Sequence, residues 1–285
     1  MKISWRKRIV REIRGRVRSR ILSKHGFAVL VESRNGVLAV DPADFNVSRT
    51  LLRDGEYGMR DVAALSAVLA DCADPRLVFA GAHLGSLLVP IARATRARHI
   101  MAFEPSPANL RLLNLNLVLN GITGVDVQRA AIGDESGTIR FTQNPTNTGN
   151  SRVAREDGRI QVPLVTLDQS PLAAWDGIDL LVMDVEGFEV HAIRGGRQTL
   201  SRTRYFFVEY APEQLQEQNS TVDEFLELIA AEFRTMYLLD HAAQYFGQRG
   251  YVDYLRRLPA RRGLLLNLLF CRDEHPDSRL VGMPS

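Results

Sequence analysis

The sequence predicts a doubly wound α/β fold with a mostly parallel sheet, preceded by a basic helix and a β-hairpin. From residue 77 onward, short apolar strand patterns alternate with helical patterns. Repeated strand–helix–strand units form parallel sheets with helices on both faces. A length of 285 residues suits one such domain with appendages better than two full domains. We therefore expect a helical leader over residues 1–25, a hairpin and helix over 26–75, the main domain over 76–272 and a tail over 273–285.

The leader is strongly basic. Residues 1–24 hold ten Lys or Arg and one Glu and so carry +9, whereas the whole chain carries +3 and the remainder −6. Ile, Val and Leu recur in this segment at spacings of three, four and seven, which is typical of a helix. Such a helix could lie on an anionic membrane surface, bind an acidic partner or pack on the body. Nothing in the acidic remainder indicates nucleic-acid recognition.

The composition is that of an ordinary globular protein, with 45% apolar and 24% charged residues. No apolar run reaches the length of roughly 18 residues that a membrane-spanning helix needs, and the N-terminus lacks the apolar core of a secretory signal. Cys72 and Cys271 are too few and too far apart for a metal site or a disulfide framework. We expect a cytoplasmic protein, which the leader could bring to the inner face of the membrane.

The first elements follow from short-range signals. Residues 27–32 and 37–40 are β-rich runs joined through Asn35-Gly36, a strong hairpin signal. Helical periodicity over residues 59–72 ends before an Asp-Pro pair. The next segments read in turn as a strand over 77–80, a helix over 86–97, a strand over 99–103, a helix over 107–120 and a strand over 125–129.

The second half continues the alternation after a less regular stretch. Residues 134–163 predict a hairpin and a polar loop over 144–152. The pattern then predicts a buried strand over 178–183, a helix over 189–200, a strand over 205–208, a helix over 222–233 and a late apolar strand over 264–270.

Polar and glycine residues stand where the predicted strands end. In open parallel sheets, ligands bind at the carboxyl ends of the strands. Gly81 and Gly85 follow the strand over 77–80, where the backbone must turn tightly and approach a ligand. Glu104 ends the next strand, and a carboxylate there can accept both hydroxyl hydrogens of a ribose. This pair fits any nucleoside-bearing cofactor, but Ala82-His83-Leu84 replaces the central glycine of the dinucleotide fingerprint and so disfavours NAD.

Several blocks resemble FkbM-family methyltransferases, in matching order and spacing from about residue 55 to 240. They are Ala82-His83, Ala102-Phe103-Glu104-Pro105-Ser106-Pro107, Asn116, Asn120, Ala130-Ala131-Ile132-Gly133-Asp134 with Gly137, Val162-Pro163-Leu164-Val165-Thr166-Leu167-Asp168, Met183-Asp184-Val185-Glu186-Gly187-Phe188-Glu189, Gly195-Gly196 and Val208-Glu209. The resemblance implies a Rossmann-like class I methyltransferase fold, S-adenosylmethionine as cofactor, and methyl transfer to a hydroxyl of a sugar or other metabolite.

Carried over by position, the resemblance also implies roles for individual residues. The methionine part of the cofactor would be wrapped by the glycine turn, the ribose held by Glu104, and the adenine placed near the block that follows residue 129. The implied cofactor-binding set is Gly81, Ala82, His83, Gly85, Glu104, Ala131 and Asp134, and the implied reaction-site set is Asp184, Glu186 and Glu209.

The candidate catalytic residues have structural alternatives. A hydroxyl acceptor needs a base, and Asp184 is the best candidate because it leaves a buried strand directly into the expected cleft, although it could also cap a helix. Glu186 could face the cleft or stabilise a helix start, and for Glu189 we favour the helix start. Asp184, Glu186 and Glu209 could hold Mg²⁺, but no spacing demands an ion, so we predict no metal.

Other polar residues carry similar alternatives. His83 could be a base, a cofactor contact or a turn residue bonded to backbone, and His191 is predicted to be structural. Asn144, Asn147 and Asn150 in the polar loop could reach a ligand or only form turns.

Two positions depart from the family pattern. Where members commonly have an acid and a lysine, this chain has Phe79 and Val182. Phe79 cannot receive the ammonium group of the cofactor, so either another polar group replaces that contact or binding is weakened. The main expectation is therefore an S-adenosylmethionine-dependent O-methyltransferase acting on a sugar, glycan or related metabolite. The alternatives are a catalytically weak or inactive binding protein of the same fold and, disfavoured, a nicotinamide-dependent oxidoreductase.

Overall fold

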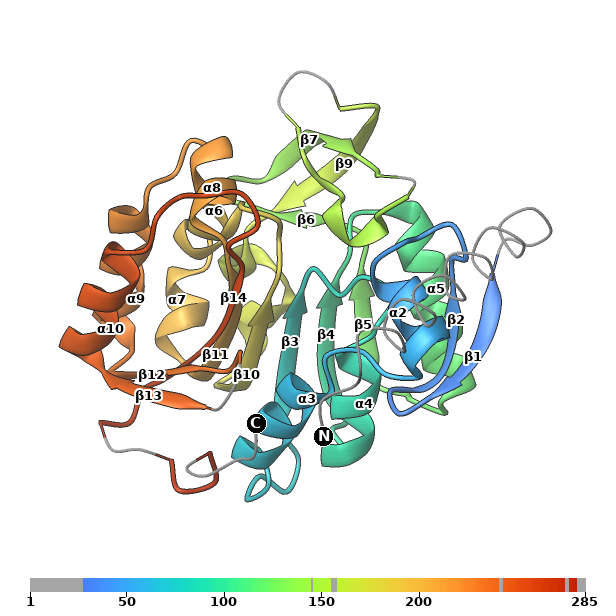
Figure 1. The fold of residues 1–285 in the computed structure, drawn as a ribbon, viewed down its shortest axis with the longest axis horizontal. Coiled ribbons are helices and arrows are strands. Elements are labelled where there is room, and N and C mark those ends of the chain that lie inside the picture. The colour runs from blue at the N-terminus through green and yellow to red at the C-terminus, as the bar shows by residue number, and fades with distance from the viewer. Residues whose placement is uncertain (1–27, 145, 155–157, 241–242, 275–276, 281–285) are drawn as a thin grey trace, which may run out of the picture.

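The computed structural model describes residues 28–144, 146–154, 158–240, 243–274 and 277–280. The predicted leader helix lies outside these residues. The described chain has a central sheet covered by helices on both faces, a smaller sheet above its upper edge and the N-terminal hairpin at one side (Figure 1). Among the helices within the described ranges, none is long and apolar enough to span a membrane. Cys72 and Cys271 are both free thiols.

The central sheet confirms the predicted doubly wound α/β fold. Its order is β13-β12-β14-β11-β10-β3-β4-β5. The parallel part comprises β3 (Arg76–Ala80), β4 (His99–Phe103), β5 (Val125–Gln128), β10 (Ile178–Met183) and β11 (Thr203–Tyr210). An antiparallel part of β12 (Thr235–Leu238), β13 (Gln244–Gly247) and β14 (Leu266–Cys271) completes one edge. The sheet is therefore mixed, and β12 and β13 were not predicted.

Alternation along the strands sends side chains to two separate cores. On β3, Leu77 and Phe79 join the core on one face, whereas Val78 and Ala80 join the core on the other. The first face is covered by α3 (Met59–Val68), α4 (Leu88–Thr95) and α5 (Pro107–Leu119). The second face is covered by α6 (Glu189–Arg194), α7 (Arg197–Ser201), α8 (Pro212–Glu217), α9 (Val222–Glu232) and α10 (Gln248–Arg256).

The N-terminal hairpin forms as predicted, with β1 (Val29–Ser33) antiparallel to β2 (Gly36–Val40). An additional helix, α2 (Val47–Asp54), follows it. The side chain of Asn116 on α5 pairs with β2 as a neighbouring strand would, since its Oδ1 accepts from the Ala39 N–H at 2.6 Å and its Nδ2 donates to the Ala39 carbonyl at 3.1 Å. Asn120 makes the same pair of bonds with Val37. These two asparagines of the resemblance therefore fasten the hairpin to the main domain.

The stretch predicted as a hairpin and polar loop is a separate sheet. Its order is β6-β9-β7-β8, formed by β6 (Ala131–Ile132), β7 (Gly137–Thr142), β8 (Arg152–Val153) and β9 (Ile160–Val165). The short 3-10 turn η1 (Thr148–Asn150) lies between β7 and β8. This small sheet stands over the carboxyl ends of the central parallel strands (Figure 1). Two further 3-10 turns, η2 (Leu167–Gln169) and η3 (Pro171–Ala174), lead into β10.

The helix predicted over residues 189–200 is broken into α6 and α7. The break falls at Gly195-Gly196, where a Cβ on Gly195 would overlap the backbone carbonyl of Gly133. The close approach of these two backbones requires a glycine, and the Gly195 carbonyl accepts from the Asp168 N–H at 3.0 Å. The prediction of one continuous helix was therefore wrong.

Candidate active site

A cavity of about 1110 Å³ lies between the carboxyl ends of the parallel strands and the small sheet. Its wall includes most of the residues that the sequence singles out: Gly81, Ala82, His83, Glu104, Ala131, Asp184, Glu186 and Glu209. Two predicted site residues, Gly85 and Asp134, are not part of the wall. The carboxyl-edge rule therefore places the candidate site at this cavity.

The turn after β3 is held tightly against the end of β10. Gly81 has a φ of +86°, and a Cβ there would overlap the backbone carbonyl oxygen of Asp184. The Asp184 N–H in turn donates to the Ala80 carbonyl at 2.9 Å. Gly85, with a φ of +88°, turns the chain into α4, and a Cβ there would lie 3.0 Å from the Leu113 side chain on α5. Gly81 thus brings the turn and Asp184 together, and Gly85 only shapes the turn.

Glu104 is built to accept hydrogen bonds. Its carboxylate is 4% exposed and accepts from the His83 N–H at 2.7 Å and the Ser106 N–H at 2.8 Å. Burial raises the pKa of Glu104 to about 7, and the two backbone donors oppose that rise. Asn109 Nδ2 also reaches Oε1, at 3.5 Å. A carboxylate has about four lone-pair sites, so one acceptor position remains, on Oε2, for a hydroxyl of a ribose. The observed geometry fits the role that the resemblance implies.

His83 is bonded to a side chain rather than to backbone. Its Nε2 lies 2.9 Å from the Thr148 hydroxyl. Burial lowers the pKa of His83 to about 4, so the ring is neutral at physiological pH. Thr148 is on η1, so this bond connects the glycine turn with the loop between β7 and β8.

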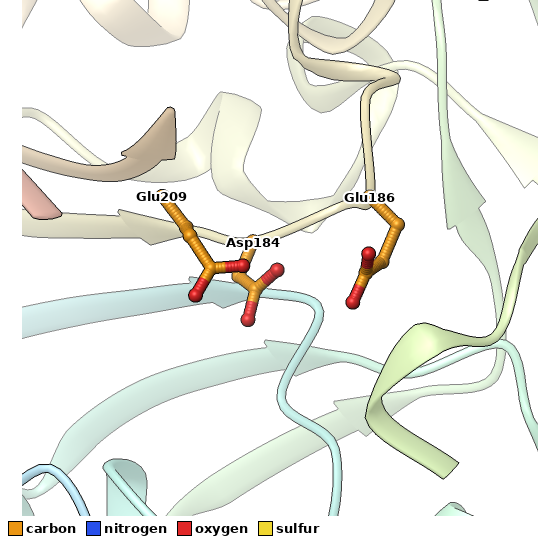
Figure 2. A group of neighbouring side chains, drawn as sticks. All are labelled: Asp184, Glu186 and Glu209. Carbon is orange, nitrogen blue, oxygen red and sulfur yellow. The ribbon is translucent and has the colours of Figure 1, made fainter. Parts of the chain in front are cut away.

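Three acids converge in the cavity on the other side of β3 from Glu104. Asp184 follows β10, Glu209 lies on β11, and Glu186 stands in the left-handed region with a φ of +55° (Figure 2). Each offers a carboxylate oxygen, and these oxygens all lie within 4.8 Å of one another. Gln214 donates to Glu186 at 2.9 Å. The trio could hold a divalent cation, but the arrangement of acids does not by itself require one, so the absence of a metal stays a prediction.

Burial and neighbouring charges give the three acids different pKa values. Burial raises the pKa of Asp184 to about 6, and a hydrogen bond with Glu209 opposes this rise. The pKa of Glu186 rises to about 9 because it is buried beside Asp184 and Glu189. Burial and the charge of Asp184 also raise the pKa of Glu209 well above its usual range. Like charges at this spacing cannot all ionise, so at neutral pH one carboxylate stands beside protonated neighbours.

The other acid of the motif has a structural role. One oxygen of Glu189 accepts from the backbone N–H groups of Gly187 at 3.2 Å and Val185 at 3.3 Å. These donors precede α6, so Glu189 stabilises the helix start, as favoured from the sequence.

Asp134 and His191 form a second structural group. His191 Nδ1 lies 3.0 Å from the Asp134 carboxylate, its Nε2 lies 3.1 Å from the Gln218 carbonyl, and its ring stacks on Phe188. The structural reading of His191 is therefore confirmed. Asp134 lies outside the cavity wall and is bonded to His191. The position that the resemblance implies for it, near the adenine, stays a prediction.

The two departures from the family pattern are neighbours in the sheet. Phe79 on β3 is the register partner of Val182 on β10, and their exposures are 2% and 3%. Both side chains join the core on the α3 and α4 face and also border the cavity. The two positions where the resemblance leads one to expect an acid and a lysine thus hold two apolar side chains of one core.

Sequence reasoning missed several residues of the cavity wall. Tyr57, which lies between α2 and α3, borders the cavity, and burial raises its pKa above the usual range, with Glu209 and Asp184 adding to the rise. Gln214 and Arg152 also border it, and Arg152 forms an ion pair with Glu217 at 2.6 Å. Only the flanking glycines at 55 and 58 hint at a turn near Tyr57. The hydrophobic periodicity of the sequence gives no signal that Gln214 and Arg152 border the cavity.

The strand order and the cavity at the carboxyl edge define a Rossmann-like class I methyltransferase fold. The family model described as the methyltransferase FkbM domain matches residues 80–252. This chain therefore belongs to the FkbM methyltransferase family.

Individual relatives are similar over part of the chain. The 2-O-methyltransferase NoeI of Sinorhizobium fredii is 36% identical over 97 residues, which cover 34% of this chain and 39% of the relative. Methyltransferase 1 of Beauveria bassiana is 28% identical over 145 residues, which cover 43% of this chain and 58% of the relative. Each match thus spans less than two thirds of the relative's length. Among solved structures, a putative O-methyltransferase from Klebsiella pneumoniae aligns at 13% identity and a TM-score of 0.44, over 77% of this chain and 83% of that one.

Proposed function

We propose that this protein is an S-adenosylmethionine-dependent O-methyltransferase whose acceptor is a hydroxyl of a sugar, glycan or related metabolite. The observation that carries the proposal is one cavity that holds the carboxylate of Glu104 after β4 and, on the other side of β3, the acids Asp184, Glu186 and Glu209. The name of the relative NoeI, a 2-O-methyltransferase, supports oxygen as the atom that is methylated.

The residues present fit the cofactor. The turn at Gly81 leaves no room for a side chain beside Asp184, so a ligand there would meet backbone. Glu104 keeps one acceptor position free, on Oε2, for a ribose hydroxyl. Asp184 borders the cavity and is ionised at neutral pH, which favours a ligand with a positive centre. When bound, S-adenosylmethionine supplies a methyl group whose bond to sulfur breaks with its electron pair left on sulfur.

Asp184 serves as the base in this proposal. With a pKa of about 6 it is ionised at neutral pH and can take the hydroxyl proton while the hydroxyl oxygen bonds to the methyl carbon. The raised pKa values of Glu186 and Glu209 keep them protonated. The single O–H of Glu209 is used in its hydrogen bond with Asp184, whereas that of Glu186 can be donated to an oxygen of the acceptor. One base and one donor at this spacing would orient a polyhydroxylated substrate, and such orientation is the main source of acceleration in methyl transfer.

The proposal is tested by methyl transfer from radiolabelled S-adenosylmethionine to a panel of sugars and glycans. Wild type is expected to label a hydroxyl-bearing acceptor. Asp184→Asn keeps the shape and removes the base, and should lower turnover by at least about 100-fold while S-adenosylhomocysteine affinity stays within a few fold. Glu104→Gln should instead weaken S-adenosylhomocysteine about tenfold. Tight cofactor binding without transfer to any acceptor would favour the inactive binding protein, and unchanged turnover in Asp184→Asn would remove Asp184 from the chemistry.

A further inference from the structure

A short strap, residues 146–149, crosses the cavity near Glu104. Asn147, Thr148 and Gly149 all border the cavity. Thr148, which is 7% exposed, is held by hydrogen bonds to three other parts of the chain. Its hydroxyl meets His83 Nε2 at 2.9 Å, its N–H donates to Asp44 Oδ1 at 3.0 Å, and its carbonyl accepts from Asn109 Nδ2 at 3.3 Å. The strap is therefore bonded to the glycine turn, to the segment before α2 and to α5.

Asp44 connects the strap with the N-terminal part of the chain. Its carboxylate is fully buried and also accepts from the Ser48 N–H at 2.7 Å, in the first turn of α2. Beside it, the Phe45 N–H donates to the Thr146 carbonyl at 2.8 Å. These residues precede the segment 80–252 that the FkbM family model matches. The segment before the family domain thus holds the strap, residues 146–149, in place at the cavity.

Asn147 presents an unsatisfied acceptor. Its Oδ1 is buried and has no hydrogen-bond partner among the described residues, although its backbone N–H donates to Asn144 Oδ1 at 3.0 Å. Leaving a buried acceptor unpaired costs free energy. A ligand that donates to this oxygen would recover that free energy, so the orphan atom points to a bound donor.

The position of the strap indicates which part of a ligand would donate a hydrogen bond to Asn147 Oδ1. Asn109 Nδ2 reaches both the Thr148 carbonyl and Glu104 Oε1, at 3.3 and 3.5 Å, so the strap and the ribose-binding carboxylate share one neighbour. A nucleoside at Glu104 carries hydroxyl and amino donors at this end of the cavity. Asn144, by contrast, uses its oxygen within the turn, where it accepts from Thr146 and Asn147.

We propose that the strap is the roof of the adenosyl site and that Asn147 Oδ1 accepts a hydrogen bond from the adenosyl group. Thr148 is a positioning residue, since it fixes the strap through His83 and Asp44. This inference rests on the proposed function, because it takes the ligand at Glu104 to be the adenosyl part of S-adenosylmethionine.

The test is calorimetric titration of the full chain with S-adenosylhomocysteine and with methylthioadenosine, which lacks the amino-acid part. Asn147→Ala should weaken both ligands by the same factor of about five to ten, because one hydrogen bond to the shared adenosyl group is lost. Thr148→Val should weaken both as well, and Thr148→Ser, which keeps the hydroxyl, should restore wild-type affinity. Thr146→Val is the matched control on the same strap, since the Thr146 hydroxyl is exposed and contacts Asn144.

The outcomes separate this inference from the proposed function. If wild type binds neither ligand, the proposed function is wrong, whatever the variants do. If wild type binds both and Asn147→Ala binds them equally well, with an unchanged melting temperature of the free protein, the roof assignment is wrong. Weakening of S-adenosylhomocysteine alone would also overturn it, because the contact would then involve the amino-acid part. A loss in Thr148→Val that Thr148→Ser does not restore would remove the positioning role of the hydroxyl.

Discussion

Replacing Phe79 by Asp restores the acid that family members commonly carry, and the structure predicts a loss of stability. Phe79 is 2% exposed and packs in the core between the sheet and α3 and α4. Truncating a buried Phe costs about 3–5 kcal/mol, and an unpaired carboxylate adds to this. We therefore expect Phe79→Asp to lower the unfolding free energy by at least about 4 kcal/mol, or Tm by roughly 8–16 °C in a domain of this size. Phe79→Leu, which preserves an apolar side chain, should cost about 1 kcal/mol.

The register partner supplies a second arm of the test. Val182→Lys alone should also destabilise, since it places an unpaired ammonium at a position that is 3% exposed. Because Phe79 and Val182 are paired across β3 and β10, the double substitution creates an adjacent Asp and Lys. Its loss of stability should be smaller than the sum of the two single losses, by about 1–3 kcal/mol.

Denaturant unfolding of the four proteins measures this coupling, and titration with S-adenosylhomocysteine measures binding alongside it. If Phe79→Asp binds S-adenosylhomocysteine more tightly than wild type and unfolds at the wild-type denaturant concentration, then position 79 is open to the cofactor and the packing argument is wrong. Additive losses in the double variant would show that the two positions do not interact.

Further expectations follow from the acids and the leader. Turnover should rise as pH increases through about 6, where Asp184 loses its proton, and Asp184→Asn should lack this rise. In the folded state the pKa of Glu186 is raised to about 9, so above the usual glutamate pKa only the unfolded chain loses this proton and the folded state loses stability as pH rises. Glu186→Gln removes this loss and should therefore raise Tm at pH 8 but not near pH 4. A metal chelator should leave turnover unchanged, and loss of activity restored by Mg²⁺ would overturn the metal-free prediction. Full-length protein should sediment with anionic vesicles at low salt and detach at high salt, whereas a chain starting at Gly26 should stay in solution; equal behaviour would give the basic leader another role.

The fold could be predicted where buried strands leave an uninterrupted apolar signal. The strands that became β3, β4 and β10 were read correctly because both of their faces are buried. The helix α2 was missed because only Val47, Ser48 and Leu51 of it are buried and its N-cap residue, Asn46, makes no side-chain cap bond. The strand β12 and the edge strand β13 were missed because their place in the sheet depends on the pairing of β12 with β14.

The candidate site could be predicted as far as the carboxyl-edge rule reaches. Gly81, Glu104 and Asp184 each follow a strand, so their convergence on one cavity is a consequence of parallel topology. Asp134 was assigned by resemblance alone, and its hydrogen bond with His191 was not visible in any local pattern. The sequence singled out Asn147 as a residue that could reach a ligand or only form a turn. It gave no signal for Thr148, whose hydrogen bonds to His83 and Asp44 join residues far apart in the sequence.

Calorimetric titration of the purified full chain with S-adenosylmethionine, S-adenosylhomocysteine and NAD tests the proposed cofactor most directly. We predict that both sulfur nucleosides bind with one site per chain, that S-adenosylhomocysteine raises Tm because it binds the folded state, and that NAD gives no heat of binding. Binding of NAD without binding of S-adenosylhomocysteine would contradict the assignment of the Gly81 turn and Glu104 to a methyl donor.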